Sequence, residues 1–211
     1  MSVDDAKQYS LQAHGTIQYL LEGIVTPGGY RLNLVFAYFL LALEHQKAIA
    51  SLVDLELRGP AFALFRLQVE TAFRGLWVGR VATDQQIEDI AKNGAKPFGT
   101  FKEMVQKVDE AYQADGRLQK IAEGWKTLSG FTHSGLEQLV RRFSPDGTLG
   151  PDYADDETET LLEFSGEFSI AMAFCIFHAN GFDEKYKALE LWKKDNRTSV
   201  GHDLEHEAID R

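Results

Sequence analysis

Apolar residues recur every three or four positions along most of this chain, between regularly spaced glycine, proline and capping residues. This period matches the turn of an α-helix, and no long stretch alternates as a half-buried strand does. The expected helices cover 2–24, 30–57, 60–80, 84–92, 101–114, 117–128, a segment from Ser134, and 184–194. Between the last two we expect a helix whose first turns hold Asp155 to Glu159 and whose strongly apolar part covers 161–179. The pattern therefore predicts an all-α bundle of about seven to nine helices.

The breaks between these segments have recognisable chemistry. Thr26-Pro27-Gly28-Gly29 and Gly59-Pro60 end the first two helices. Thr83 with Gln86, and Thr100 with Glu103, match the capping box that opens a helix. Nothing in 211 residues requires a second core, so we expect one domain over residues 1–195 and a polar tail over 196–211.

The helix expected at 60–80 is the one around which the others should pack. Aromatic and aliphatic residues form one stripe, at Phe62, Phe65, Val69, Phe73 and Leu76. Small residues form the opposite side, at Ala61, Ala72, Gly75 and Gly79. Neither side favours water, so the helix should be largely buried.

The charges between Pro60 and Gly79 are Arg66, Glu70 and Arg74, four residues apart and therefore in one row. The pattern predicts that this row is mostly buried. Desolvating ions costs several kcal/mol each unless partners compensate it, so such a row needs an explanation. One is a structural network that ties neighbouring helices together. The other is a site in which the guanidinium groups, oriented by Glu70, hold a phosphate or carboxylate.

Two further segments supply polar groups that can meet this row. Glu44 and His45 come within reach if the second and third helices form an antiparallel hairpin. Ser129 and His133 flank a helix junction whose apolar neighbours should turn it toward the core. His45 and His133 also fit the simpler role of histidines that pack or hydrogen-bond locally.

Charge and composition narrow the classes of function. The net charge is −10, which opposes non-specific attraction to nucleic acid. The single cysteine, Cys175, lies in an apolar run and fits a buried inert thiol in a reducing compartment. Neither a signal peptide nor an apolar run of bilayer-spanning length is present, so we expect a cytoplasmic protein without a membrane partner.

Catalytic and metal signatures are largely missing. His202-Asp203-Leu204-Glu205-His206 fits the inverted zinc-protease pattern, but only five residues follow it, too few for the usual downstream ligand. Phosphate-binding, dinucleotide and serine-hydrolase motifs are absent from the sequence. We expect no metal and no cofactor.

The segment Phe65-Arg66-Leu67-Gln68-Val69-Glu70 with Arg74, preceded by Glu44-His45 and followed by Ser129 and Thr132-His133, resembles uncharacterised bacterial proteins distantly related to the HEPN superfamily. The resemblance covers roughly residues 30–140. It implies an all-α, HEPN-like core, a homodimer, and in many members metal-independent ribonuclease activity in toxin or phage-defence systems. The chain departs from the family's R-x4-6-H motif, because Lys126 precedes His133 where arginine would stand, and Arg197 with His202 lies in the tail.

These observations leave three functions open, and whether the protein is an enzyme is undecided. The first is a binding or regulatory module in which Arg66, Arg74 and His133 hold a small anion without breaking a bond. The second is a ribonuclease that uses His133 as general acid/base, with RNA as its partner. The third is a purely structural charge row in a protein that works through a partner-binding surface.

Overall fold

A computed structural model describes residues 1–25, 29–123, 136–143 and 147–196 of the chain. The helices are α1 (Val3–Leu21), α2 (Tyr30–Asp54), α3 (Arg58–Arg80), α4 (Asp84–Asn93), α5 (Phe101–Tyr112), α6 (Arg117–Glu123), α8 (Leu136–Val140), α9 (Asp155–Ala179) and α10 (Asp183–Asp195). Over the described residues the only strand-like pairing is an isolated bridge between Phe143 and Leu149. The all-α prediction, with about seven to nine helices, is confirmed.

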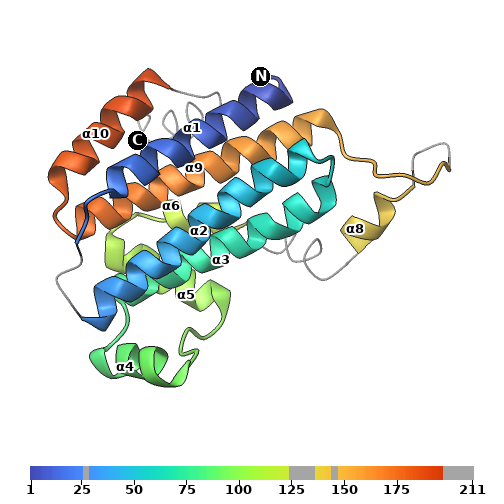
Figure 1. The fold of residues 1–211 in the computed structure, drawn as a ribbon. Coiled ribbons are helices and arrows are strands. Elements are labelled where there is room, and N and C mark those ends of the chain that lie inside the picture. The colour runs from blue at the N-terminus through green and yellow to red at the C-terminus, as the bar shows by residue number, and fades with distance from the viewer. Residues whose placement is uncertain (26–28, 124–135, 144–146, 197–211) are drawn as a thin grey trace.

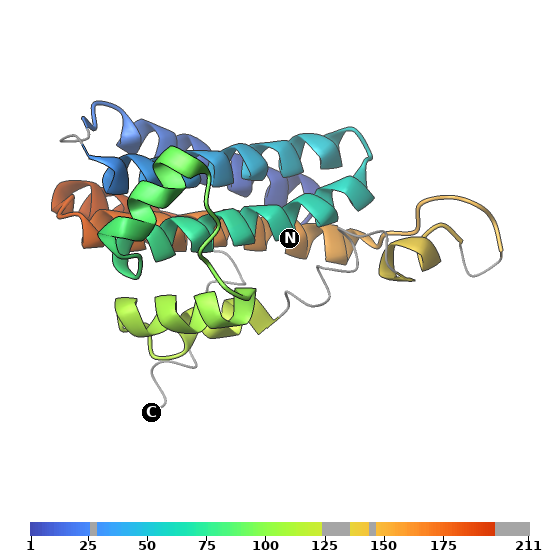
Figure 2. The ribbon, with the colours of Figure 1, turned by 90° about the horizontal axis from the view of Figure 1, so that it is seen from below.

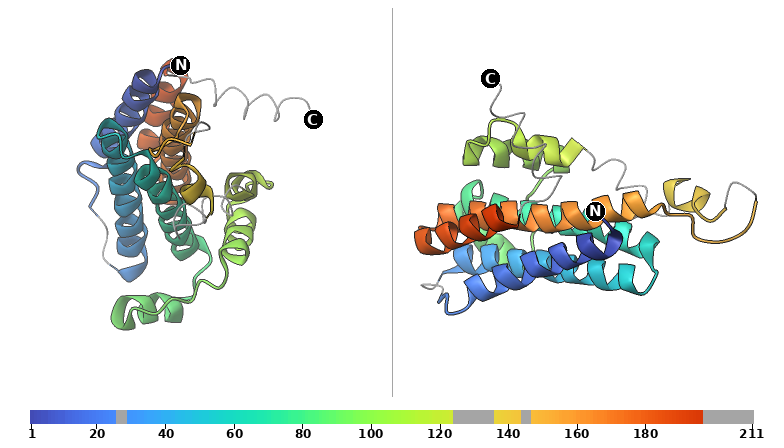
Figure 3. Two further views of the ribbon diagram at one scale, coloured as in Figure 1. Left: turned by 90° about the vertical axis from the view of Figure 1, so that its right-hand side faces the viewer. Right: turned by 90° about the horizontal axis from the view of Figure 1, so that it is seen from above.

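Four long helices form the body of the molecule. α1, α2, α3 and α9 lie side by side, and α10 packs against α1 and α9 (Figure 1). On the other side α5 packs along α3, and α6 packs against α5 (Figure 2). The end-on view shows this second group of helices beside the four-helix body (Figure 3). α3 is therefore the helix of the four-helix body that α5 covers.

Local signals explain most helix ends. The capping boxes at Thr83 and Thr100 both form, as the sequence predicts, and a third forms at Ser2 with Asp5. Several boundaries differ from expectation, among them the end of α1, which lies at Leu21 instead of residue 24. α3 begins at Arg58, before Pro60, and α2 ends at Asp54, because Leu55 to Leu57 make the turn between the two helices. The predicted polar tail lies mostly outside the described residues.

α2 and α3 form the expected antiparallel hairpin (Figure 1), and the small residues of α3 let it close tightly. A Cβ atom built at Gly75 would lie 3.0 Å from the Cβ of Tyr38 and 3.6 Å from the carbonyl oxygen of Val35. The apolar stripe of α3 faces the core on the other side, where Val69, Phe73 and Leu76 are fully buried. The predicted rotation of α3 is therefore correct for these residues.

A layer of amide and hydroxyl groups crosses the apolar core. Gln46 on α2 donates to the backbone oxygen of Ser10 on α1, at 2.9 Å. Gln68 on α3 donates to Ser165 O and Ser169 Oγ on α9, at 3.0 and 2.9 Å, and accepts from Ser165 Oγ at 2.6 Å. All five side chains are buried. We call this set the polar layer, and it contacts each of the four long helices.

α9 is long and apolar enough, by length and composition, to cross a membrane. About two thirds (67%) of its most apolar window is buried inside the bundle, as in the core helix of a soluble protein. One such helix is weak evidence for a membrane span.

Candidate functional site

The charge row of α3 is mostly buried, as the sequence predicts, but it keeps some contact with solvent. The side chain of Arg74 is 32% exposed and that of Glu70 is 22% exposed, and Arg66 is also intermediate. Phe98, from the segment before α5, covers part of Arg74, and Tyr38 of α2 lies near the same guanidinium. The charges therefore keep contact with water while their stems pack on the protein.

Arg74 has the most defined surroundings in this row. Its Nη2 donates to Glu70 Oε1 at 2.5 Å, one turn earlier in the same helix. Its guanidinium carbon lies 5.2 Å from the centre of the Phe98 ring, within the range of a cation–π contact. Its Nε is buried without a hydrogen-bond partner. Arg74 is therefore fixed in place while most of its five donors stay unused among the described residues.

The ring under Arg74 comes from the connection between α4 and α5. Gly94 ends α4 in the left-handed conformation. The chain then places the Phe98 ring edge-on against Trp77 and Tyr38, with 5.2 and 6.3 Å between the ring centres. Burial raises the pKa of Tyr38, and the nearby charge of Arg74 opposes that rise. The sequence reasoning missed Phe98, because a loop residue 24 positions from Arg74 carries no periodic signal.

The other predicted site residues are less closely gathered. His45 on α2 is half-buried, with its Nδ1 buried and without a partner, whereas Glu44 is exposed to solvent. Burial lowers the pKa of His45, and Glu44 partly opposes this. Ser129 and His133 lie outside the described residues. The described part of the site is thus the Glu70–Arg74–Phe98 group, which we call the Arg74 site.

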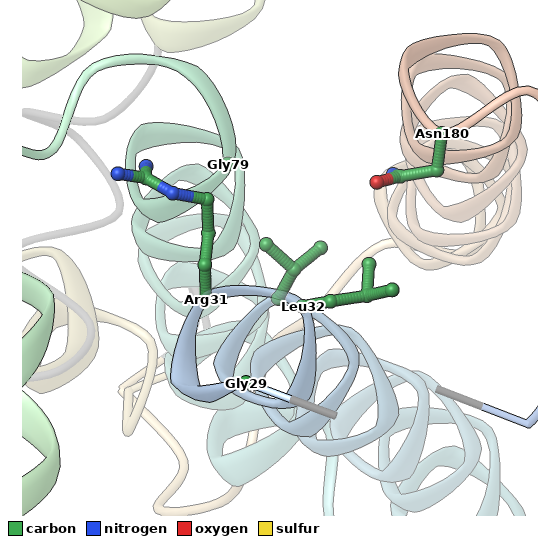
Figure 4. Close-up of a pocket in the computed structure, with 6 residues that line it drawn as sticks. Gly29, Arg31, Leu32, Gly79 and Asn180 are labelled. Carbon is green, nitrogen blue, oxygen red and sulfur yellow. The ribbon is translucent and has the colours of Figure 1, made fainter. Parts of the chain in front are cut away.

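A pocket of about 170 Å³ lies away from this site, at the end of the bundle. Asn180 faces Arg31 and Leu32 across it, with Gly79 of α3 at its side (Figure 4). The guanidinium of Arg31 donates to the carbonyl oxygens of Val78 and Ala82 at 2.7 and 2.8 Å, and so caps the end of α3. This arginine therefore has a structural task.

A family model described as a family of unknown function, DUF6988, matches residues 39–188, well over half of the 211-residue chain. The chain belongs to the DUF6988 family. Comparisons with curated proteins and with solved structures gave no match. In this DUF6988 protein the matched region runs from within α2 into α10 and contains the whole Arg74 site.

Metal-type ligands do not cluster in the described part of this DUF6988 protein, where no three His, Cys, Asp or Glu side chains gather. The histidines of the tail motif lie outside the described residues. Burial raises the pKa of the Cys175 thiol to about 11, so it stays protonated at neutral pH. This agrees with the inert cysteine that the sequence predicts.

His14 is a polar residue that the DUF6988 protein buries between α1 and α2. Both ring nitrogens are buried without a partner that meets hydrogen-bond geometry, and so is the Oε1 of nearby Gln46. Burial, with the charge of Lys47, lowers the pKa of His14, while neighbouring polar groups oppose this. The imidazole is therefore neutral in the folded protein near pH 7.

We expect the protein to lose stability when the pH falls from about 8 to about 5, because His14 and His45 both have lowered pKa values in the folded state. Between the folded and unfolded pKa values the unfolded chain binds more protons. The stability that comes from keeping these two histidines neutral is therefore fully present above the pKa that they have in the unfolded chain. It is lost as the pH falls through their lower pKa values in the folded protein. Urea midpoints across this range measure it, and His14→Gln should flatten the slope. An unchanged slope would contradict the assignment.

Proposed function

We propose that this protein is a binding or regulatory module whose Arg74 site holds an anionic group, a phosphate or a carboxylate, of a ligand or partner. Arg66 supplies a second positive charge further along the same helix. Binding breaks no bond in this proposal.

The observation that carries the proposal is the state of Arg74. Glu70 engages one of its donors, Phe98 supports its guanidinium, and a third of the side chain is open to water. Preorganised guanidinium groups bind carboxylates and phosphates with little loss of side-chain freedom.

Thermal unfolding with inorganic phosphate tests this proposal at constant ionic strength. Phosphate at ten times its Kd should stabilise the wild type by about 1.4 kcal/mol, because it binds only the folded state. Arg74→Gln should lose this response. Arg80→Gln is the matched control, because Arg80 also lies over a ring, 5.6 Å from Tyr112, but is exposed at the end of α3. Equal responses of both variants would rule out the Arg74 site.

Glu70→Gln is a second variant in the same assay. Breaking a fully buried ion pair costs about 3–5 kcal/mol, and an exposed pair contributes at most about 1 kcal/mol. Because the Arg74–Glu70 pair is only partly exposed, the stability lost in Glu70→Gln should lie between these limits. Phosphate should restore part of that loss. A large loss that phosphate does not change would instead favour the structural network.

Incubation with labelled RNA and EDTA separates binding from catalysis. The binding module leaves the RNA intact. Chelator-resistant cleavage that is lost in His133→Ala would favour the metal-independent ribonuclease in place of this proposal.

A further inference from the structure

Two side chains that contact the Phe98 ring each carry a buried N–H group without a hydrogen-bond partner among the described residues. In Arg74 this group is Nε, and the guanidinium carbon lies 5.2 Å from the centre of the Phe98 ring. In Trp77 it is Nε1, and the centres of the Trp77 and Phe98 rings are 5.2 Å apart. A buried donor without a hydrogen bond has lost its contact with water and gained nothing in return. An acceptor that reaches both side chains would therefore satisfy two donors.

Phe98 belongs to a part of the Arg74 site that can move without unpacking a helix. It lies in the connection between α4 and α5, whereas Arg74 and Trp77 are one turn apart on α3. Gly94 and Gly99 border this connection, with φ angles of 63° and 70°. Glycine adopts such angles at little cost, so the chain can bend at both positions. A rearrangement between the two glycines therefore displaces Phe98 and opens the space beside Arg74 and Trp77.

The place that Phe98 occupies suits an aromatic ring. The residue is only 7% exposed. The rings of Trp77 and Tyr38 stand at 71° and 86° to the Phe98 ring, and the guanidinium of Arg74 lies over that ring. Edge-to-face and cation–π contacts both depend on the charge distribution of an aromatic ring, so an aliphatic group in this place would lose them. A ligand that replaces Phe98 should therefore carry an aromatic ring.

The two unpaired donors indicate the charged part of this ligand. A carboxylate has two oxygen atoms, which can accept from the N–H of Arg74 and from the N–H of Trp77. A phosphate has more oxygen atoms and more charge, whose burial costs free energy, so it suits the exposed part of Arg74 better. Given the anion binding proposed above, on which this step rests, we propose that the Arg74 site binds an aromatic carboxylate. The ring of the ligand replaces Phe98, and its carboxylate accepts hydrogen bonds from Arg74 and Trp77.

Calorimetric titration of the full chain with benzoate tests the proposal. Trp77→Phe removes the N–H and keeps a ring, so it should weaken benzoate binding about tenfold, as expected for one hydrogen bond to a charged group. Arg74→Gln should abolish the binding. Trp192→Phe is the matched control, because Trp192 lies on α10, where its ring stacks on Tyr9 with 6.0 Å between the ring centres. This control should leave the Kd for benzoate unchanged.

Phe98→Ala shows whether Phe98 competes with the ligand. Alanine leaves the place of the ring open, so this variant should bind benzoate about tenfold more tightly than the wild type, because no buried ring has to be displaced. Weaker binding would mean that Phe98 is a wall of the site, and would overturn the proposal. Acetate has no ring and should bind both proteins much more weakly than benzoate.

Equal affinities for benzoate and acetate, or an unchanged Kd in Trp77→Phe, would also overturn the proposal. So would the absence of benzoate binding in both the wild type and Phe98→Ala. If inorganic phosphate in that case still stabilises the wild type but not Arg74→Gln, the proposed function stands and only the aromatic carboxylate is wrong. A phosphate response that survives in Arg74→Gln would remove the proposed function itself.

Discussion

Truncation of Phe73 to alanine is expected to lower the free energy of unfolding by about 3–5 kcal/mol. The side chain is fully buried, and its ring lies 5.6 Å from that of Phe101 on α5 and 6.0 Å from that of Phe168 on α9. Its removal leaves a cavity where three helices meet, and fixed neighbours cannot close it. The loss therefore includes both the transfer of the ring to water and the empty volume.

Urea unfolding followed by circular dichroism measures this effect. Phe164→Ala is the matched control, since that phenylalanine on α9 is 39% exposed and its truncation should cost less than about 1 kcal/mol. Equal losses in the two variants would mean that α3 does not turn Phe73 toward the core.

Replacement of Gln68 by leucine is expected to destabilise the protein by about 2–3 kcal/mol, although the volume is nearly conserved. The amide donates to two oxygen atoms of α9 and accepts from a third group there. Leucine leaves these buried partners without hydrogen bonds. Unsatisfied buried polar groups cost more than the lost bonds contribute.

A multiple-mutant cycle checks the cause. Ser165→Ala and Ser169→Ala remove the hydroxyl groups that Gln68→Leu leaves without a hydrogen-bond partner. The triple variant should therefore be more stable than Gln68→Leu alone. Additive losses would contradict the polar layer as a coupled unit. The same unfolding assay serves for all variants.

Much of the fold could be predicted because its signals are local. The stripe that contains Val69, Phe73 and Leu76 and the capping boxes at Thr83 and Thr100 need only neighbouring residues to be recognised. The break near Gly59-Pro60 is a local signal as well; it predicted the α2–α3 hairpin, although the turn itself lies at Leu55 to Leu57. Helix periodicity and capping therefore predicted the bundle.

Features that depend on distant residues were beyond such reasoning. Gln68 finds its partners 97 and 101 positions away, and Arg74 finds Phe98 in a loop. The exposure of the Arg66–Arg74 row depends on how completely α5 covers it, which periodicity does not report. The position of the row on α3 and its largely buried state were predicted, whereas the part that stays open to water was not.

The functional expectations remain predictions. They include the distant relation to HEPN proteins, a bacterial source, a cytoplasmic location, and a role for Ser129 and His133. The DUF6988 family carries no described function, so the argument for anion binding depends on the geometry of Arg74.

The pairing of α1 with α9 has a consequence for biosynthesis. Tyr9 donates to Glu167, 158 positions later, and a Cβ atom at Gly166 would lie 3.2 Å from the Cα of Ser10. A ribosome therefore releases α1 long before its partner exists, whereas α2 and α3 can pair as soon as both have emerged. The part of α1 that packs on α9 therefore stays uncovered until α9 is made, although α1 can already contact α2. Translation that stops before α9 thus yields a fragment prone to aggregate.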